Sequence, residues 1–300
     1  MKKDIKKRGV PKTPDPSFKV TEEAELMNFL LAEMPHKNRD NIKSYLRFRQ
    51  VLVNDQPVSQ FNYHLVPGQT VTVTRNKISP SKTYKGISIL YEDNDIIVID
   101  KHAGVLSVAT SKKEKFTAYS LLWDHVKKNN ADGKIFIVHR LDRDTSGVML
   151  FCKSAKVQKF LQQNWNDIIR ERVYVALAEG LVDPPNGEIS SYLQENANGV
   201  VWSSQEPGDG QWAVTEYETI KANEFLSLLR MSLRTGRKNQ IRVHLQDIGH
   251  PILGDKKYGS KQNPLGRMGL HALVIAFQHP VTGKEMRFET HIPRKFSLAI

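Results

Sequence analysis

Cysteine is nearly absent from this sequence. One cysteine, Cys152, occurs among 300 residues, which excludes an internal disulfide and any zinc site built from several thiolates. Long apolar runs are absent as well, because none approaches the roughly 18 residues that span a bilayer. The lysines near the amino terminus precede no apolar segment, so they do not form a secretory signal. We therefore expect a cytoplasmic protein with no membrane partner.

Acidic residues are outnumbered by basic ones. The chain has 32 Asp and Glu against 44 Lys and Arg, which gives a net charge of +12 and a pI of about 9.6. Such an excess favours a polyanionic partner such as RNA, DNA or an anionic membrane, although many basic proteins bind none of these. Residues 1–16 are rich in lysine and proline, which predicts a flexible basic tail.

Residues 17–75 are predicted to form a small α+β unit, because two segments with helical apolar spacing precede short strands and turns. On the second helix, Arg39, Lys43 and Arg47 fall four residues apart and share one face. Like charges at this spacing destabilise an isolated helix by about 0.2–0.5 kcal/mol per pair. A phosphate backbone would relieve that repulsion, so we interpret the three residues as RNA-binding. A solvated basic face is the alternative.

Residues 76–86 are polar and are interpreted as a linker, and residues 87–300 as a larger domain. Helices are expected in that domain at residues 117–128, 154–170 and 239–248, with Ser154 as a cap. Strands are expected at residues 87–91, 96–99, 172–181, 214–220 and 225–233. This mixture of hairpins and scattered helices predicts an α+β fold without regular β-α alternation.

The most informative stretch runs from His139 to Gly147 between two apolar runs, residues 135–138 and 148–151. The runs have the length and composition of buried strands, so the polar stretch between them is predicted to be a loop in which Gly147 takes a positive φ. Asp142 follows Arg140 and precedes Arg143, and such cations favour the ionised carboxylate. Considered alone, this cluster is more typical of structural ion pairs than of a catalytic site.

The full string is more specific than its charges. His139-Arg140-Leu141-Asp142 followed by Thr145-Ser146-Gly147 resembles the signature of the RluA-type pseudouridine synthases, His-Arg-Leu-Asp-x-x-Thr-Ser-Gly. The resemblance implies that Asp142 is the catalytic residue and that Arg140 enters the space vacated by a flipped nucleotide. It also implies a mixed, largely antiparallel sheet with flanking helices.

Three later segments are similar to the same family, and the last of them, residues 254–259 together with 270–272, completes the family pattern. The segment 172–176 resembles the second motif, which implies that Tyr174 stacks on the target base. The segment 234–245 resembles the third motif, which implies that Arg242 contacts the catalytic carboxylate. Its turn is flanked by Arg234, Arg237 and Lys238, which we interpret as RNA-binding. Two positions depart from the family. In the loop 101–104, where the family usually has Lys-Pro-x-Gly, His102 replaces the proline, and Asn239 replaces a usual histidine.

The resemblance implies an enzyme that isomerises uridine in RNA to pseudouridine. This reaction consumes no external group, and we expect no cofactor because the glycines at 208 and 210 precede a strand-like segment instead of a helix. A metal site from His139, Asp142 and Asp144 has no further support, so we expect no metal.

The amino-terminal unit resembles the RNA-binding domain named after ribosomal protein S-four, which favours 23S ribosomal RNA as the substrate. We also expect a monomer. Transfer RNA is the alternative substrate. A non-catalytic RNA-binding factor for ribosome assembly is the alternative function.

Overall fold

The structure is a computed structural model that describes residues 15–47, 50–54, 56–58, 60–74, 83–111 and 114–300. The chain divides into two compact units, residues 1–82 and 83–300. The predicted tail and most of the predicted linker lie outside the described residues, so the domain boundaries stay a prediction. None of the described helices is long and apolar enough to cross a membrane.

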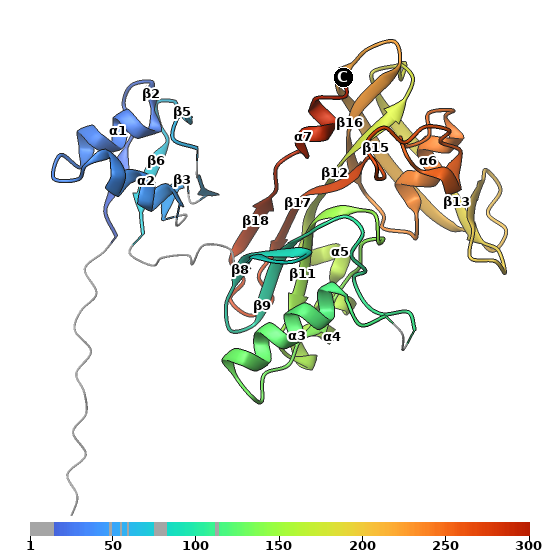
Figure 1. The fold of residues 1–300 in the computed structure, drawn as a ribbon, viewed down its shortest axis with the longest axis horizontal. Coiled ribbons are helices and arrows are strands. Elements are labelled where there is room, and N and C mark those ends of the chain that lie inside the picture. Colours follow the sequence, from blue (N-terminus) through green and yellow to red (C-terminus); the bar gives the residue numbers. More distant parts are fainter. Residues whose placement is uncertain (1–14, 48–49, 55, 59, 75–82, 112–113) are drawn as a thin grey trace, which may run out of the picture. The chain divides into compact units, whose positions relative to one another are not determined.

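The first unit packs two short helices against a small antiparallel sheet (Figure 1). The sheet has the strand order β1-β6-β3-β4, and β2 pairs with β5 apart from it. Leu26, Leu30 and Ile42 are fully buried, as the predicted helical stripes require. The helices are α1 (Leu26–Glu33) and α2 (Arg39–Arg47), and the strands are β1 (Ser17–Lys19), β2 (Ala24–Glu25), β3 (Val51–Val53), β4 (Gln56–Pro57), β5 (His64–Leu65) and β6 (Thr70–Val73).

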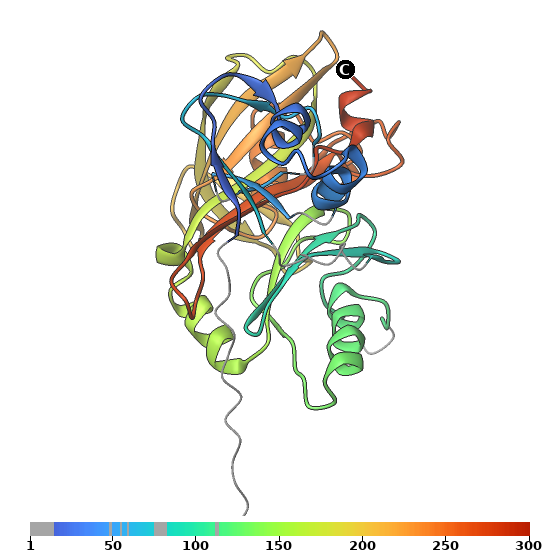
Figure 2. The ribbon, with the colours of Figure 1, turned by 90° about the vertical axis from the view of Figure 1, so that its left-hand side faces the viewer.

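The second unit is built on one long sheet in which the described strands follow the order β14-β13-β15-β16-β12-β17-β11-β9-β8-β7. Strand β10 pairs beside β11, and β18 pairs beside β17, with which it forms the long red pair in Figure 2. All described pairs in this sheet are antiparallel except β11 with β17. The strands are β7 (Thr83–Tyr84), β8 (Ile87–Glu92), β9 (Ile96–Lys101), β10 (Phe136–Ile137), β11 (Ser146–Cys152), β12 (Ile169–Glu179), β13 (Asn186–Glu195), β14 (Val201–Ser204), β15 (Gln211–Ala222), β16 (Leu226–Leu233), β17 (Leu270–Gln278) and β18 (Glu285–Glu289).

Helices flank this sheet at both ends (Figure 1). They are α3 (Ala118–Asn129), α4 (Ala155–Gln163) and α5 (Trp165–Ile168) beside one half, α6 (Gln240–Asp247) beside the other, the short η1 (Lys256–Tyr258), and α7 (Arg294–Ser297) near the carboxyl terminus. This arrangement confirms the predicted α+β class with a mixed, largely antiparallel sheet and flanking helices. It also gives each half of the sheet its own apolar core.

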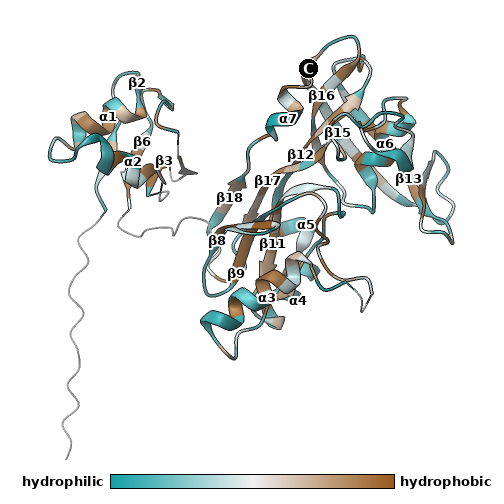
Figure 3. Cartoon of the chain, in the orientation of Figure 1, coloured by the Kyte–Doolittle hydropathy of each residue, from teal (hydrophilic) through white to brown (hydrophobic). Residues whose placement is uncertain are grey.

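Burial explains why some elements were predictable and others were not. Strands β9 and β11 each contain a continuous apolar run, both have neighbouring strands on either side in the sheet, and both are brown in Figure 3. Ser154 caps α4 as predicted, because its hydroxyl accepts a hydrogen bond from the Val157 N–H at 3.2 Å. The helix predicted over residues 154–170 is interrupted at Asn164, continues as α5 over Trp165–Ile168 and ends there, because β12 begins at Ile169.

Gly147 joins the two halves of the sheet. It takes φ +116° as predicted, and it pairs with Ala272 where β11 runs parallel to β17. A Cβ at this position would lie 2.1 Å from the Ala272 carbonyl oxygen, so no other residue fits without moving a strand. The close approach places the loop that ends at Gly147 over the boundary between the two cores.

Candidate active site

Buried side chains hold the backbone of the loop of residues 138–145 in place. Leu141 is 4% exposed, and its backbone N–H and carbonyl both hydrogen-bond the Ser107 hydroxyl, at 3.1 and 2.6 Å. Lys101 is fully buried and donates to the carbonyls of Arg143, Val105 and His102 at 3.1, 2.7 and 3.2 Å. Burial lowers the pKa of Lys101 to about 8. These bonds give the Asp142 loop a single defined backbone path.

His139 supports the loop and does not face the site. Its Nε2 accepts the backbone N–H of Leu150 at 3.0 Å, and its ring lies 5.1 Å from the ring of Trp165. Burial, helped by the charge of Arg172, lowers the pKa of His139 to about 4. The imidazole is therefore neutral near pH 7 and acts as a hydrogen-bond acceptor within the fold.

Arg242 on α6 connects the loop to the second half of the sheet. Its Nη1 donates to Asp142 Oδ2 and to Asn239 Oδ1, both at 3.0 Å. Its Nε and Nη2 donate to the two oxygens of Asp255 at 2.6 and 2.9 Å. Burial lowers the pKa of Arg242, but the hydrogen bonds and charges of Asp255 and Asp142 more than offset burial, so the pKa lies above its ordinary value. The guanidinium is thus a permanent cation in one orientation.

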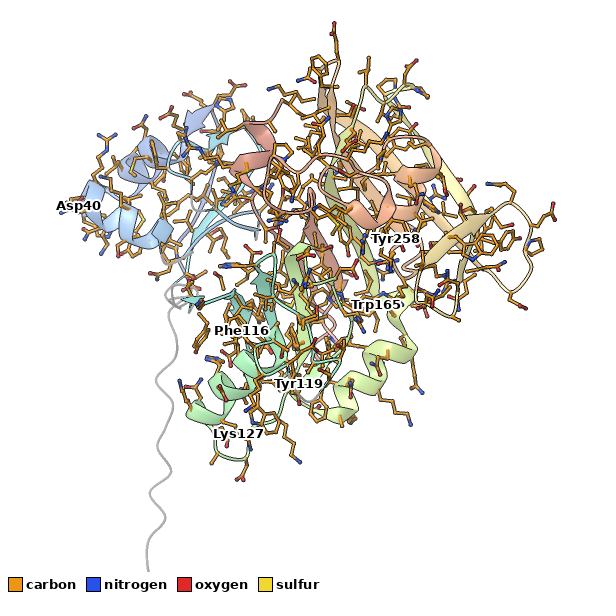
Figure 4. All side chains as sticks on the ribbon, turned by 45° about the vertical axis from the view of Figure 1, so that its right-hand side comes forward. Asp40, Phe116, Tyr119, Lys127, Trp165 and Tyr258 are labelled. Carbon is orange, nitrogen blue, oxygen red and sulfur yellow. The ribbon has the colours of Figure 1, made fainter. Side chains whose placement is uncertain are left out.

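The support behind Arg242 is itself buried. The Asp255 side chain is 2% exposed, and the ring of Tyr258, labelled in Figure 4, lies 4.7 Å from the Arg242 guanidinium carbon. Asn239 takes a left-handed backbone with φ 56° and donates from Nδ2 to the Tyr258 hydroxyl at 2.9 Å. Asparagine tolerates this conformation better than most residues. Asn239, which stands where the family usually has a histidine, therefore links Arg242 to Tyr258.

A pocket of about 410 Å³ opens over this arrangement. It is lined by Arg140, Leu141, Asp142, Thr145, Tyr174, Leu233, Gly236, Arg237, Lys238, Asn239, Gln240, Ile241, Arg242 and Leu270. Segments more than 90 residues apart in sequence thus meet at one pocket, which includes four residues predicted for the reaction: Arg140, Asp142, Tyr174 and Arg242. We call this space the active-site pocket.

The exposure of Asp142 and the burial of Tyr174 determine what each side chain can do in the pocket. The Asp142 side chain is 35% exposed, and its Oδ1 accepts no hydrogen bond from a described residue, whereas Oδ2 is held by Arg242. A carboxylate so placed can accept a proton or attack an electrophilic carbon. Burial, with a small contribution from Asp142, raises the pKa of Tyr174 to about 12. The tyrosine therefore stays neutral near pH 7 and offers an aromatic surface instead of a base.

The predicted RNA-binding residues are not all brought together. Arg237 and Lys238 line the active-site pocket, where Arg237 donates to the Trp212 carbonyl at 3.1 Å and Lys238 pairs with Glu195. Arg234 is 64% exposed, pairs with Glu216 and lines a neighbouring pocket instead. Arg39 and Lys43 are exposed on α2 of the first unit, and the Arg47 side chain lies outside what the structure describes.

Three residues important to the site were not assigned roles from the sequence: Lys101, Arg172 and Asp255. Lys101 and Asp255 are buried and Arg172 is partly buried, and nothing in a linear sequence distinguishes them from solvated surface charges. The only signal was their position inside or beside the family motifs at residues 101–104, 172–176 and 254–259.

Among the described residues, one group could hold a metal ion: Asp93, Asp95 and His279. Asp93 already accepts hydrogen bonds from the backbone N–H groups of Asp95 and Ile96, both at 2.8 Å. His279 is engaged at both ring nitrogens, by Asp93 on one side and backbone N–H groups on the other. These bonds use the atoms a metal would need, so we interpret the group as a structural turn.

Comparison with known proteins gives consistent results. Residues 95–247 match the family described as RNA pseudouridylate synthase. The chain is 33% identical over 257 residues to the uncharacterized RNA pseudouridine synthase YhcT of Bacillus subtilis, covering 84% of each chain. It is 29% identical over 276 residues to ribosomal large subunit pseudouridine synthase D of Neisseria meningitidis, covering 87% of this chain and 73% of the other. The structure of human RNA pseudouridylate synthase domain containing 4 superposes with a TM-score of 0.58 at 23% identity, covering 70% of this chain and 90% of the other.

Proposed function

We propose that this chain, which belongs to the RNA pseudouridylate synthase family, modifies uridines of 23S ribosomal RNA. Membership in the family makes the chain an isomerase that converts uridine in RNA to pseudouridine. The proposal of ribosomal RNA is supported by the name of the Neisseria relative, and the net charge of +12 suits an RNA substrate of either kind. Transfer RNA is the alternative substrate that the experiment below separates from it.

We assign the chemistry to Asp142. Isomerisation breaks the bond between ribose carbon one and uracil nitrogen one, rotates the base, and joins carbon five to the ribose. The base loses the proton on carbon five and gains one on nitrogen one, so substrate and product have the same composition. Asp142 either attacks ribose carbon one or removes a proton from ribose carbon two. Both roles need the arrangement found here, an accessible Oδ1 with Oδ2 held by Arg242. This geometry is the observation on which the assignment depends.

Tyr174 and Arg140 are proposed to handle the nucleotide. A base inside a helix is inaccessible, so it must be extruded at a cost of a few kcal/mol. Tyr174 lines the pocket with a neutral ring, and stacking on an aromatic side chain contributes about 1–3 kcal/mol per base. Arg140 is exposed and lines the same pocket, so it is suited to fill the space that the base leaves.

The substrate is tested by mapping pseudouridines in 23S ribosomal RNA and in transfer RNA from cells with and without this protein. We expect specific pseudouridines of 23S ribosomal RNA to disappear without the protein and to return with the wild-type chain but not with an Asp142→Asn variant. Loss confined to transfer RNA would contradict the ribosomal proposal and leave the isomerase activity intact.

The first unit is proposed to act as an S-four-like RNA-binding domain, residues 17–75, through the basic face of α2. Replacing Arg39, Lys43 and Arg47 together by glutamine should weaken binding to 23S ribosomal RNA. The slope of log affinity against log salt should become shallower by about 0.7 for each phosphate contact that is lost. Affinity measured over a range of potassium chloride concentrations checks both effects.

The matched control replaces Lys156 and Lys159, two exposed lysines on α4 that line none of the pockets described above. This variant should keep the wild-type slope. An unchanged salt slope in the triple variant would contradict docking through α2. So would a change in slope per removed charge that is equal in both variants.

A further inference from the structure

Arg172 is a charged residue beside the active-site pocket that the reaction described above does not use. It lies on β12 two positions before Tyr174, so both side chains leave the same face of the strand. Its guanidinium lies directly against the loop that lines the pocket, because a Cβ on Gly236 would lie 2.1 Å from Arg172 Nη1. The absence of a side chain at Gly236 therefore makes room for the arginine.

No hydrogen bond or ion pair joins the Arg172 guanidinium to any described residue. Two other partly buried arginines of this unit are engaged, since Arg267 donates to the Ser146 hydroxyl at 2.8 Å and Arg287 to Glu289 at 2.6 Å. Burial and the charge of Arg237 both lower the pKa of Arg172. A partly desolvated cation without an anion destabilises a fold, and a bound anion would remove that cost.

The surroundings of Arg172 also favour the binding of an anion. It lines a pocket of about 440 Å³ that shares Leu233 with the active-site pocket. This second space, which we call the arginine pocket, is lined by four arginines, Arg170, Arg172, Arg230 and Arg234. Its two acidic residues, Glu171 and Glu216, are contacted by Arg287 and Arg234. Neither carboxylate is therefore left to neutralise Arg172.

We propose that Arg172 binds a phosphodiester of the RNA strand, so that the arginine pocket holds the backbone while the adjacent active-site pocket holds the uridine. The proposal rests on the RNA isomerase function and adds a positioning residue to it. A guanidinium presents a planar pair of N–H donors that matches a phosphate, and its weak hydration suits a partly buried position. A neutral base edge would leave the charge uncompensated.

The test compares Arg172→Met, which removes the charge and keeps an apolar stem, with the wild-type chain. Single-turnover tritium release from 23S ribosomal RNA transcribed with uridine tritiated at carbon five gives the half-saturating enzyme concentration and the maximal rate. We expect half-saturation to rise about tenfold, the salt slope to fall by about 0.7, and the maximal rate to change little. Arg172→Lys should recover part of the affinity.

Thermal stability separates binding from a structural role. Removing an uncompensated cation should raise the Tm of Arg172→Met by about 2–4 °C, whereas loss of a structural residue would lower it. Arg294→Met, at an exposed arginine of α7 that lines neither pocket, is the control and should resemble the wild type.

Unchanged half-saturation and salt slope in Arg172→Met, a lower Tm, or a slower maximal rate at unchanged half-saturation would each overturn the proposal. Failure of the ribosomal assignment gives a different result. In that case the wild-type chain releases no tritium from this RNA, and the same comparison is made with tritiated transfer RNA.

Discussion

Replacing Asp142 with asparagine should lower the maximal rate of tritium release by about 10²–10⁴-fold, the range for loss of a positioned acid–base group. Asparagine keeps the shape of the side chain but cannot attack a carbon or take a proton at neutral pH. Arg242 keeps its bonds to Asp255 and Asn239 in this variant, so the fold should be preserved. Single-turnover tritium release measures the rate, and thermal melting checks the fold.

The matched control is Asp144→Asn, which removes a carboxylate of the same loop. Asp144 pairs with Arg143 at 3.0 Å and does not line the active-site pocket. We expect this variant to retain the wild-type rate within a few-fold. A comparable loss in both variants would mean that the rate depends on loop charge, and a fully active Asp142→Asn would exclude Asp142 from the chemistry.

Asp255→Asn should have the largest effect on stability. The carboxylate is 2% exposed and accepts two hydrogen bonds from Arg242. Removing one partner of a buried ion pair leaves the other charge uncompensated and destabilises a protein by about 3–5 kcal/mol. For a unit of this size we expect Tm to fall by about 6–20 °C. Activity should fall as well, because Arg242 would no longer be held against Asp142.

A double variant gives the control for this prediction. Replacing the pair by apolar residues, Arg242→Met with Asp255→Leu, removes both buried charges and should recover much of the lost stability. It should not recover activity, since Asp142 then lacks its arginine. If Asp255→Asn melts at the wild-type temperature, the ion pair between Arg242 and Asp255 does not stabilise the fold as predicted.

Local pattern predicted much of the secondary structure. The apolar runs at residues 96–99 and 148–151 could be recognised as buried strands because both of their faces are covered by the core. Strands β13, β14, β17 and β18 were not predicted. In β13, buried Ile189 and Leu193 alternate with partly exposed polar residues, and this pattern in isolation is weaker than a continuous apolar run.

The contact between Asp142 and Arg242 spans 100 positions of sequence, and no local periodicity encodes it. Only the resemblance between motifs suggested that they meet. The segment 254–259 also resembles the family, but that resemblance gave Asp255 no role, and Gly254-Asp255-Lys256-Lys257-Tyr258 has the composition of a solvated turn. Its carboxylate is buried where it accepts two hydrogen bonds from Arg242 of α6, and this contact is a property of the tertiary structure alone.

A structure of the Asp142→Asn variant bound to an RNA substrate would test the central claim most directly. The decisive quantity is the distance from the side chain of residue 142 to carbons one and two of the target ribose. We predict about 3–3.5 Å to one of these carbons, with the extruded base against Tyr174. A uridine bound with its ribose away from residue 142, while the RNA occupies the active-site pocket, would contradict the assignment of Asp142 as the catalytic residue.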